Sequence, residues 1–523
     1  MKKTNKWLFT MAAASIAVHT AAALPAAHAA EAEGKAVRDM VSNMQGTLKW
    51  DTRDKSVNVS LGDTTAVFRT GSAKAVLDGE EVTLDQAPYI EHGKLYISDQ
   101  AAEQLRDRVI AAQNGTGYKL AGSFQMPSGK AEIAASTPDG SRLLVTEADK
   151  GSVSVLDITY TDQVSEIKNI SFHSLSDKAE VTSVAVMPDG KHAIAVIRTG
   201  DNFNDPNPGM AAIINLDTYE IAKVYETGIG PDSIAISRDG NYAVIAIEDE
   251  ELDPKTEEFD YTANKRPGSI AVLHFPKGNV LAGELVQVPV DLSGVEGAIY
   301  PHEPQPEYVA ISPDSTTAAV TLQENNVIAV VDLKTRKLVR IFALGTTTHA
   351  ADAKDDGRVS FTDEITARYE PDGIAFTTDG RYLLTANEGD LGGNEFKDGV
   401  KAGGRNIAVW SLEGDKIYDS ADMIDKAAAR VGLYPDGRSE KKGSEVENLT
   451  IAKVNGRDIA AVASERADAI LFFDLSNPEA PALLGLIPTA GESPEGIHYV
   501  NTSDTFISAD EGTGTISFYK RQQ

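Results

Sequence analysis

Short runs of alternating apolar and polar residues recur along most of this chain, and Pro, Asp, Asn and Gly separate them. The pattern is plainest in residues 306–333, which read PEYVAISPDSTTAAVTLQENNVIAVVDL and predict three consecutive strands at 308–312, 317–322 and 327–333. Apolar side chains at every second position, bounded by turn residues, are typical of short antiparallel strands. The sequence is therefore predicted to be mainly β.

This unit of three strands is repeated along the chain. We count seven copies, which begin at Ala131, Val181, Pro231, Pro306, Pro371, Val446 and Pro494. One copy cannot bury its own faces but a ring of copies can, so the repeat predicts a seven-bladed β-propeller of four-stranded blades. The last copy ends after its third strand, and we expect the strand at 118–126 to complete it and close the ring. A β-solenoid is the alternative fold, and the uneven insertions between copies argue against it.

The first 117 residues lie outside the repeat. Residues 1–29 combine three lysines, an apolar run and an Ala-His-Ala motif, which predicts a secretory signal peptide. Residues 30–117 predict a helix, six short strands and a second helix, and so a small stalk-like α+β domain that ends in a flexible linker at 114–117. The propeller is expected over residues 118–523. No later stretch has the ~20 apolar residues of a membrane-spanning helix, so we expect an exported protein, secreted or held at the cell surface.

The composition narrows the chemistry. The chain has no cysteine, which excludes disulfides, thiolate metal sites and cysteine nucleophiles. Its formal charge is −29 and becomes −32 without the three lysines of the predicted signal peptide. Such a charge disfavours nucleic acid and anionic membranes as partners and favours cations. The alternative is an acidic surface that is only solvated.

Acidic residues occupy two repeated positions of the unit. In a blade with up-and-down strands, the start of the inner strand and the end of the next strand open onto one face, around the central channel. The acids before the inner strand are Glu132, Asp232, Glu307, Asp372, Glu447 and Glu495. The acids after the next strand are Glu147, Glu248, Glu324, Glu388, Glu465 and Glu511. Thr182 and Arg198 stand at these two positions in the second copy.

So many carboxylates at one channel mouth would repel one another unless they are protonated or neutralised by a cation. Hard oxygen ligands in this number suit Ca²⁺ or Mg²⁺, and we predict a divalent-cation site with Ca²⁺ as the expected ion and other divalent cations as alternatives. The predicted ligands are Glu132, Asp232, Glu307, Asp372, Glu388, Glu447, Glu495, Asp201 and Asp205. The last two belong to an insertion at 200–210. In the alternative, the repeated acids cap backbone amides and bind nothing.

Whether the protein is an enzyme stays open. The sequence contains no G-x-S-x-G, H-E-x-x-H or G-x-x-x-x-G-K-[ST] motif, so an enzyme would use metal or carboxylate chemistry. In a metal-dependent phosphoesterase, acids of the channel face would hold the ions that polarise a phosphate and activate water, and a loop histidine would act as a base or ligand. The candidate catalytic residues are Glu307, Asp372, Glu388, Glu495 and His302.

Other loop residues extend these hypotheses. His349 is a second candidate base or ligand, and residues 352–357 (DAKDDG) are a second candidate cation loop. Arginines on the same face, Arg198 among them, would bind an anionic group or act as counter-charges to the acids. A lactonase-like or carbohydrate-active enzyme is the third hypothesis, because a propeller fold alone does not select a function.

Several strings resemble a known family. TANEGD at 385–390, LQENN at 322–326, ADAKDDG at 351–357 and SPEG at 493–496 resemble the choice-of-anchor I domain, and the resemblance extends over residues 118–520. That bacterial family is related to the mesenchyme-specific surface glycoproteins of biomineralising animals and is often labelled alkaline-phosphatase-like. The resemblance implies a secreted or surface-attached propeller with a link to cations or phosphate esters.

Residues 30–117 resemble the copper amine oxidase N-terminal-like domain, a stalk-like module of exported proteins. The resemblance rests on the pattern of turns and strands. His92 is the only histidine of this segment, and we predict an exposed turn residue rather than a copper ligand. For the whole chain the expected partners are divalent cations, with phosphate esters, polysaccharide and cell-wall or matrix components as further candidates.

Overall fold

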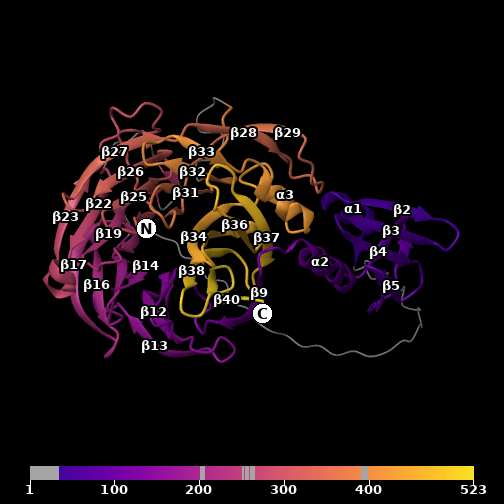
Figure 1. Cartoon of the computed structure of the whole chain (residues 1–523), viewed down its shortest axis with the longest axis horizontal. Coiled ribbons are helices and arrows are strands. Elements are labelled where there is room, and N and C mark those ends of the chain that lie inside the picture. The colour runs from indigo at the N-terminus through magenta and orange to yellow at the C-terminus, as the bar shows by residue number, and fades with distance from the viewer. Residues whose placement is uncertain are drawn as a thin grey trace, which may run out of the picture.

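The computed structural model describes residues 34–200, 206–249, 252–253, 258–259, 266–389 and 399–522. The predicted signal peptide lies outside the described residues. Figure 1 shows a small N-terminal module, drawn in indigo, beside a larger body of β-sheets arranged around a common centre. The prediction of a mainly β protein is confirmed.

The N-terminal module consists, in its described residues, of two helices and two antiparallel sheets. The five-stranded sheet has the order β2 (Thr47–Asp51), β3 (Ser56–Leu61), β4 (Thr64–Arg69), β5 (Lys74–Leu77) and β6 (Glu80–Thr83). The three-stranded sheet has the order β1 (Lys35–Ala36), β8 (Lys94–Ile97) and β7 (Tyr89–Glu91). The helices are α1 (Val37–Asn43) and α2 (Asp99–Gln113). Buried and exposed residues alternate along β3 and β4, so one face of the larger sheet forms the core of the module.

Seven antiparallel sheets of four strands make up most of the remaining described chain, and we number them in the chain order of their first strands. Sheet 1 consists of β10 (Ala134–Ser136), β11 (Arg142–Glu147), β12 (Ser152–Asp157) and β13 (Ser165–Ser171), and sheet 2 of β14 (Glu180–Val186), β15 (His192–Arg198), β16 (Pro208–Asn215) and β17 (Glu220–Ile229). Sheet 3 consists of β18 (Pro231–Ile236), β19 (Tyr242–Ile247), β22 (Ser269–His274) and β23 (Glu284–Pro289). Sheet 4 consists of β24 (Val309–Ile311), β25 (Thr317–Leu322), β26 (Val327–Asp332) and β27 (Lys337–Ala343).

Sheets 5 to 7 follow the same plan. Sheet 5 consists of β30 (Ile374–Phe376), β31 (Tyr382–Asn387), β32 (Asn406–Ser411) and β33 (Lys416–Asp419). Sheet 6 consists of β34 (Val446–Val454), β35 (Arg457–Ser464), β36 (Ala469–Asp474) and β37 (Ala482–Pro488). Sheet 7 consists of β38 (Pro494–Val500), β39 (Thr505–Asp510), β40 (Thr515–Arg521) and β9 (Tyr118–Gln125). The second and third strands, such as β25 and β26, are buried along nearly their whole length because neighbouring sheets cover both faces.

The connections between the sheets carry the other described elements. Two short antiparallel pairs are β20 (Leu252–Asp253) with β21 (Glu258–Phe259) and β28 (Thr346–Ala351) with β29 (Asp363–Arg368). Helix α3 (Met423–Arg430) lies between sheets 5 and 6. The short 3-10 helices are η1 (Ala148–Lys150), η2 (Pro276–Gly278), η3 (Val280–Ala282), η4 (Asp436–Arg438) and η5 (Glu465–Ala467).

The seven sheets form a closed cycle of contacts. The first strand of each sheet contacts the first strand of the next, from β10 through β14, β18, β24, β30 and β34 to β38, and β38 contacts β10. Strand β40 pairs with β9, from Thr515 opposite Gln125 to Arg521 opposite Tyr118. The expected completion of the last sheet by the strand before the first copy is therefore confirmed. The pairing removes two free sheet edges.

A histidine links the first strands of sheets 7 and 1. His498 Nε2 lies 3.2 Å from Ser136 N and 2.8 Å from Ser136 Oγ. Because the backbone N–H can only donate, Nε2 accepts and the ring proton lies on Nδ1. Burial lowers the pKa of His498 from its ordinary 6.5 to about 4. The contribution of the neutral ring to stability is therefore complete above pH 6.5 and is lost as the pH falls toward 4.

This shift predicts a pH-dependent loss of stability. Between pH 7 and pH 5, the free energy of unfolding of the wild type is expected to fall by about 2 kcal/mol more than that of His498→Gln. The glutamine oxygen can accept the same hydrogen bonds but does not titrate, and the carboxyl groups titrate in both proteins. Urea denaturation at a series of pH values measures the difference. An identical pH dependence of the two proteins would contradict the assignment.

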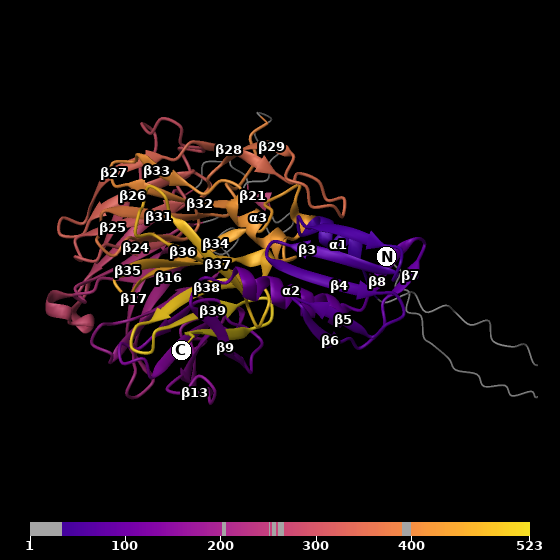
Figure 2. The ribbon, with the colours of Figure 1, turned by 45° about the vertical axis from the view of Figure 1, so that its right-hand side comes forward.

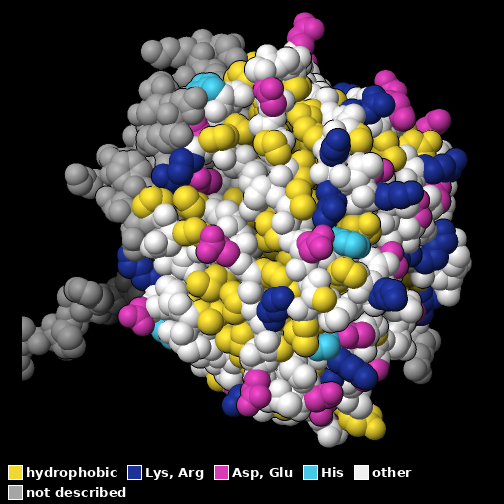
Figure 3. Space-filling model, turned by 90° about the vertical axis from the view of Figure 1, so that its left-hand side faces the viewer, with side chains coloured by type: hydrophobic (Ala, Val, Ile, Leu, Met, Phe, Trp, Pro, Cys, Tyr) yellow, Lys and Arg dark blue, Asp and Glu magenta, His cyan; other side chains and the backbone are white. Residues whose placement is uncertain are grey.

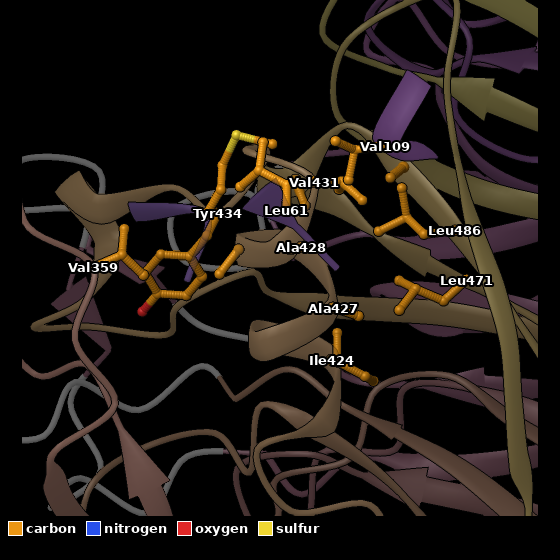
Figure 4. Close-up of a cluster of buried hydrophobic side chains, with 14 of the residues drawn as sticks. Leu61, Val109, Val359, Ile424, Ala427, Ala428, Val431, Tyr434, Leu471 and Leu486 are labelled. Atoms are coloured by element: carbon orange, nitrogen blue, oxygen red, sulfur yellow. The ribbon is translucent and has the colours of Figure 1, made fainter. Parts of the chain in front are cut away.

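The N-terminal module packs against sheet 6 and the segment that follows α3. Leu61 and Val109 of the module share one hydrophobic cluster with Val431, Tyr434 and Leu486 (Figure 4). Figure 2 shows the same neighbourhood from a second direction, with α2 beside β37. Because this cluster is continuous, the module packs directly against the ring of sheets.

The segment at 114–117 is fixed at this junction. Gly115 N donates a hydrogen bond to Leu484 O of β37 at 2.8 Å. Asn114 Nδ2 donates to Tyr118 O at 3.0 Å, and Thr116 N donates to Asn114 Oδ1 at 3.0 Å. The prediction of a flexible linker is therefore wrong. Its Asn, Gly and Thr residues do favour a turn, but the partner strand that fixes the turn lies far away in the sequence.

Candidate metal centre

The negative charge belongs to the repeated sheets rather than to the N-terminal module. Residues 34–117 contain 12 Asp and Glu against 10 Lys and Arg, whereas residues 118–523 contain 64 against 36. On the face that Figure 3 shows, acidic and basic side chains are interspersed among apolar ones. Acidic side chains are instead concentrated at the centre of the ring of sheets.

The acids predicted before the inner strands act on one another at this centre. Burial, followed by the charge of Asp372, raises the pKa of Glu307 well above its usual range. Burial, followed by the charge of Glu388, does the same for Asp372. Burial and then Glu132 raise the pKa of Glu495. Carboxyl groups from different sheets influence one another in this way because burial removes the water that would screen their charges.

A cleft of about 440 Å³ opens at this centre, and Glu495 lines it whereas Glu307 and Asp372 do not. It is lined by Glu132, Ala148, Asp149, Glu180, Glu388, Glu447, Glu465, Arg466, Glu495 and Glu511. Within the described parts of the chain, one group of three acids has the spacing of metal ligands. A carboxyl oxygen from each of Glu388, Glu447 and Glu465 lies within 4.8 Å of the other two. We call these three residues the glutamate triad.

Strand ends of two neighbouring sheets bring the triad together. Glu388 follows β31 of sheet 5, Glu447 is the second residue of β34, and Glu465 follows β35 of sheet 6. Val446 lies opposite Ser464 in the antiparallel ladder, so Glu447, just inside β34, and Glu465, just after β35, lie at the same end of the sheet. The triad thus combines one acid from the first predicted set with two from the second.

Three charged carboxylates are energetically unfavourable at the triad in the absence of a cation. Burial, followed by the charges of Glu388 and Asp372, raises the pKa of Glu447 well above its usual range. The Oε2 atom of Glu447 is buried and has no hydrogen-bond partner. Burial, together with a hydrogen bond to Glu445, raises the pKa of Glu465 to about 8. Protons or a metal ion must therefore compensate the buried charge at neutral pH.

Basic side chains neutralise parts of the acidic rings. Arg198 donates to Asp232 Oδ1 at 3.2 Å and to Glu248 Oε2 at 2.7 Å. Arg466 Nε donates to Glu445 Oε2 at 2.8 Å. For Arg198, the structure thus favours the counter-charge interpretation over an anion site.

Two basic side chains, Lys442 and Arg466, contact members of the triad. Lys442 Nζ donates to Glu388 Oε1, and Gln323 Nε2 donates to Glu388 Oε2 at 2.9 Å. Burial still raises the pKa of Glu388, although both of these contacts favour its charged form. Arg466 NH1 lies 3.0 Å from Glu465 Oε1. Glu447 is the member of the triad whose buried oxygen is left without a donor.

Other acids of the predicted sets serve the local structure. Glu147 turns away from the cleft and accepts hydrogen bonds from Ser128, Ser152, Ser154 and Asn169. Glu147 therefore serves the local structure through side-chain donors, and not through the backbone amides that the capping alternative expected. A pattern of acids at equivalent positions cannot distinguish the two uses, because the deciding serines lie on other strands of the same sheet.

The loop candidates outside the acidic rings are not gathered at the triad. Both ring nitrogens of His349 lie 3.0 Å from backbone oxygens, those of Ala350 and Gly404. His302 is exposed in the turn before β24 and does not line the cleft. Asp201 and Asp205 lie outside the described residues. The predicted role of Asp201 and Asp205 as metal ligands therefore stays a prediction.

The second candidate cation loop, residues 352–357, uses its carboxylates on the backbone. Asp352 Oδ2 accepts from Ser360 N at 3.1 Å, and Asp356 Oδ1 accepts from Arg358 N at 3.0 Å. Asp355 Oδ1 accepts from Glu440 N at 2.8 Å. These contacts favour a turn that binds the 436–445 segment over a cation loop.

Sequence reasoning missed several residues of the centre. Glu180 and Asp149 line the cleft, and Lys442 and Glu445 reach it from the insertion between sheets 5 and 6. Glu180 lies two positions before Thr182, so the second copy does have an acid near the expected place. The run KKGSE at 441–445 was a weaker signal, because a charged stretch in an insertion is more often solvated.

The four-stranded sheets arranged around a centre define a mainly β protein of the propeller type. The chain belongs to the choice-of-anchor I domain family, whose model matches residues 132–402 and 391–478. Residues 36–116 match the model of the copper amine oxidase N-terminal domain. Both resemblances drawn from the sequence are confirmed.

Solved structures give distant similarities. The β-propeller domain of Cps50 (Swd1) from Myceliophteria thermophila is 8% identical with a TM-score of 0.49, covering 77% of this chain and 100% of that one. The hydrazine synthase of Kuenenia stuttgartiensis is 13% identical with a TM-score of 0.47, covering 76% and 96%. No curated protein matches the sequence. Among the described residues, no helix combines the length and the apolar character needed to cross a bilayer.

Proposed function

We propose that this protein is an exported or surface-attached seven-bladed propeller that binds a divalent cation, with Ca²⁺ as the expected ion, at the acidic mouth of its channel. The observation that carries the proposal is the glutamate triad, whose oxygens lie within 4.8 Å of one another. The seven four-stranded sheets and their closed cycle of contacts support the number of blades. The proposed boundaries are a signal peptide at 1–29, the module at 30–117 and the propeller at 118–523.

The chemistry of the triad fits a hard divalent cation. Calcium takes six to eight oxygen ligands at about 2.3–2.6 Å in flexible geometry, and water completes sites with few protein ligands. Glu447 offers a buried oxygen that has no donor, and Glu388 and Glu465 offer oxygens beside it. Glu132, Glu180 and the other acids of the cleft add negative potential that draws cations to the mouth.

Binding of the ion is expected to stabilise the fold. Calcium at about 100 times its dissociation constant should raise the free energy of unfolding by ~2.7 kcal/mol, and Glu447→Gln should abolish most of this gain. Without calcium, Glu447→Gln should be at least as stable as the wild type, because it replaces a carboxyl group whose charged form is unfavourable at this buried site. Thermal and urea denaturation, with and without chelator, measure both effects.

The matched control is Glu413→Gln, which removes an exposed glutamate between β32 and β33 and should leave the calcium effect unchanged. A wild type that calcium, magnesium and manganese all fail to stabilise would contradict the proposal. Metal analysis of the purified protein identifies the ion. The ion would also have a catalytic role if the protein hydrolyses p-nitrophenyl phosphate and if both a chelator and Glu388→Gln abolish this activity.

A further inference from the structure

A lysine already occupies one side of the glutamate triad. Lys442 Nζ donates to Glu388 Oε1, and the lysine side chain is 18% exposed. Its charge also lowers the pKa of Asp372 and of Glu445, against the raising effect of burial. The fold thus delivers one positive charge to the acids from a segment outside the repeat, residues 436–445.

This segment is anchored on both sides of the lysine. A guanidinium nitrogen of the buried Arg405 donates to Ser439 O at 2.8 Å and to Lys441 O at 2.6 Å. On the other side, Ser444 N donates to Asp425 Oδ1 at 3.1 Å. Gly443 has φ +59°, and a Cβ there would lie 2.7 Å from a carboxylate oxygen of Asp425. The close approach requires glycine, so the backbone around the lysine is fixed.

The N-terminal module supports the same segment from outside. Asp436 Oδ2 accepts a hydrogen bond from Gly357 N at 2.7 Å. Asn43 of α1 holds the loop at 357–359: its Nδ2 donates to Gly357 O at 3.2 Å, and its Oδ1 accepts from Val359 N at 3.2 Å. Tyr434, two residues before the segment in sequence, packs in the cluster shared with the module (Figure 4). Contacts are therefore continuous from the module to Lys442.

We propose that Lys442 is a built-in competitor for the cation at the glutamate triad, and that the N-terminal module holds this lysine in place. The proposal rests on the proposed function, because it concerns the same site. An ammonium group that is bonded to Glu388 must move before a metal ion can take that oxygen. A divalent ion gains more from the three acids than a monovalent ion does, so the lysine excludes monovalent cations and lowers the affinity for divalent ones.

The decisive variant is Lys442→Gln in the full chain. It keeps a hydrogen-bond donor, on a side chain that is one atom shorter, and removes the charge. Calcium affinity, measured by isothermal titration calorimetry, is expected to rise about tenfold, since close charge pairs in desolvated sites couple by more than the ~1.4 kcal/mol that a factor of ten represents. Sodium at 100 mM should weaken calcium binding more in this variant than in the wild type.

The matched control is Lys453→Gln. Lys453 of β34 forms an ion pair with Asp458 of β35 at 2.7 Å and does not line the cleft. This variant therefore changes the net charge of the protein by the same amount, at a distance from the site. Wild-type affinity in the control, together with the gain in Lys442→Gln, supports the competitor role. If the wild type binds calcium and Lys442→Gln has an equal or lower calcium affinity, the inference is wrong. The proposed function would still hold. Absence of binding in every protein would overturn both.

A second arm tests the part of the module. Asn43→Ala removes two hydrogen bonds to the 357–359 loop, and Asn58→Ala, an exposed position on β3, is its control. Asn43→Ala should raise calcium affinity about two- to tenfold in the wild type and leave it unchanged in Lys442→Gln. An equal effect in both backgrounds, or no effect in the wild type, would show that the module does not act through the lysine.

Discussion

Replacing Arg405 by methionine is expected to lower the free energy of unfolding by about 3–5 kcal/mol. Arg405 is 1% exposed and lies 3.7 Å from the carboxylate of Asp425, which is equally buried. Its guanidinium also donates to three backbone oxygens, of Asp352 at 3.1 Å and of Ser439 and Lys441. Methionine fills a similar volume but leaves the carboxylate and these carbonyl groups without their donors. Urea denaturation measures the loss.

Two further variants show which interaction is lost. Arg381→Met removes an exposed arginine that pairs with Asp379 at 2.6 Å, and it should change stability by less than about 1 kcal/mol. The double variant Arg405→Met with Asp425→Leu should recover part of the loss, because it removes the buried charge as well as its partner. A loss for Arg405→Met no larger than that for Arg381→Met would contradict the anchoring role of Arg405.

The repeat could be predicted because its signals are local. The second and third strands of each sheet are covered on both faces and therefore appear as uninterrupted apolar runs, as in 317–322. The turns between first and second strands repeat one hydrogen-bond pattern: Ser312 Oγ and Thr316 N bond to Asp314 Oδ1 at 2.6 and 3.1 Å. Residues within five positions of one another decide such a turn, so the sequence alone reveals it.

The candidate site was only partly predictable, because its neutralising groups come from distant positions. The repeated acids indicated where charge gathers, but neither Lys442 nor Arg405 belongs to the repeat. The loop at 357–359 is bonded to Asn43, which is more than 300 residues away in the sequence. Glu147 shows the opposite failure, since an acid at a repeated position is used by serines and an asparagine of its own sheet.

Neutralisation is unequal around the ring, and the triad is the candidate centre because it combines a carboxylate oxygen without a donor with the spacing of metal ligands. Arg198 bonds to acids of both predicted sets in sheet 3. In sheets 5 and 6, Lys442 reaches Glu388 and Arg466 reaches Glu465, but no donor reaches Glu447 Oε2 and the pKa of Glu447 stays raised. A repeat that supplied equal charges everywhere would create equal sites, so the proposed ion site depends on the departures from the repeat.

Replacing Tyr118 by alanine is expected to lower the free energy of unfolding by about 3–5 kcal/mol, because a large buried ring is lost where the ring of sheets closes. Tyr118 is the first residue of β9 and is 1% exposed. Its ring stacks on Phe472 of sheet 6 at 5.6 Å and meets the edge of Phe506 at 5.1 Å. Its hydroxyl donates to Asp504 Oδ1. The residue thus joins sheets 6 and 7 directly after the module.

Tyr118→Phe separates packing from hydrogen bonding. Asp504 keeps Tyr499 OH at 2.9 Å and Arg521 Nε at 2.7 Å, so this variant should lose only about 1 kcal/mol. Tyr160→Ala is the control, because that tyrosine is 65% exposed, and it should have almost no effect on the free energy of unfolding. The module, the closing strand and sheet 6 share their contacts here, so calorimetry should show one unfolding transition that Tyr118→Ala moves as a whole. A separate early transition of the module in the wild type would contradict this coupling.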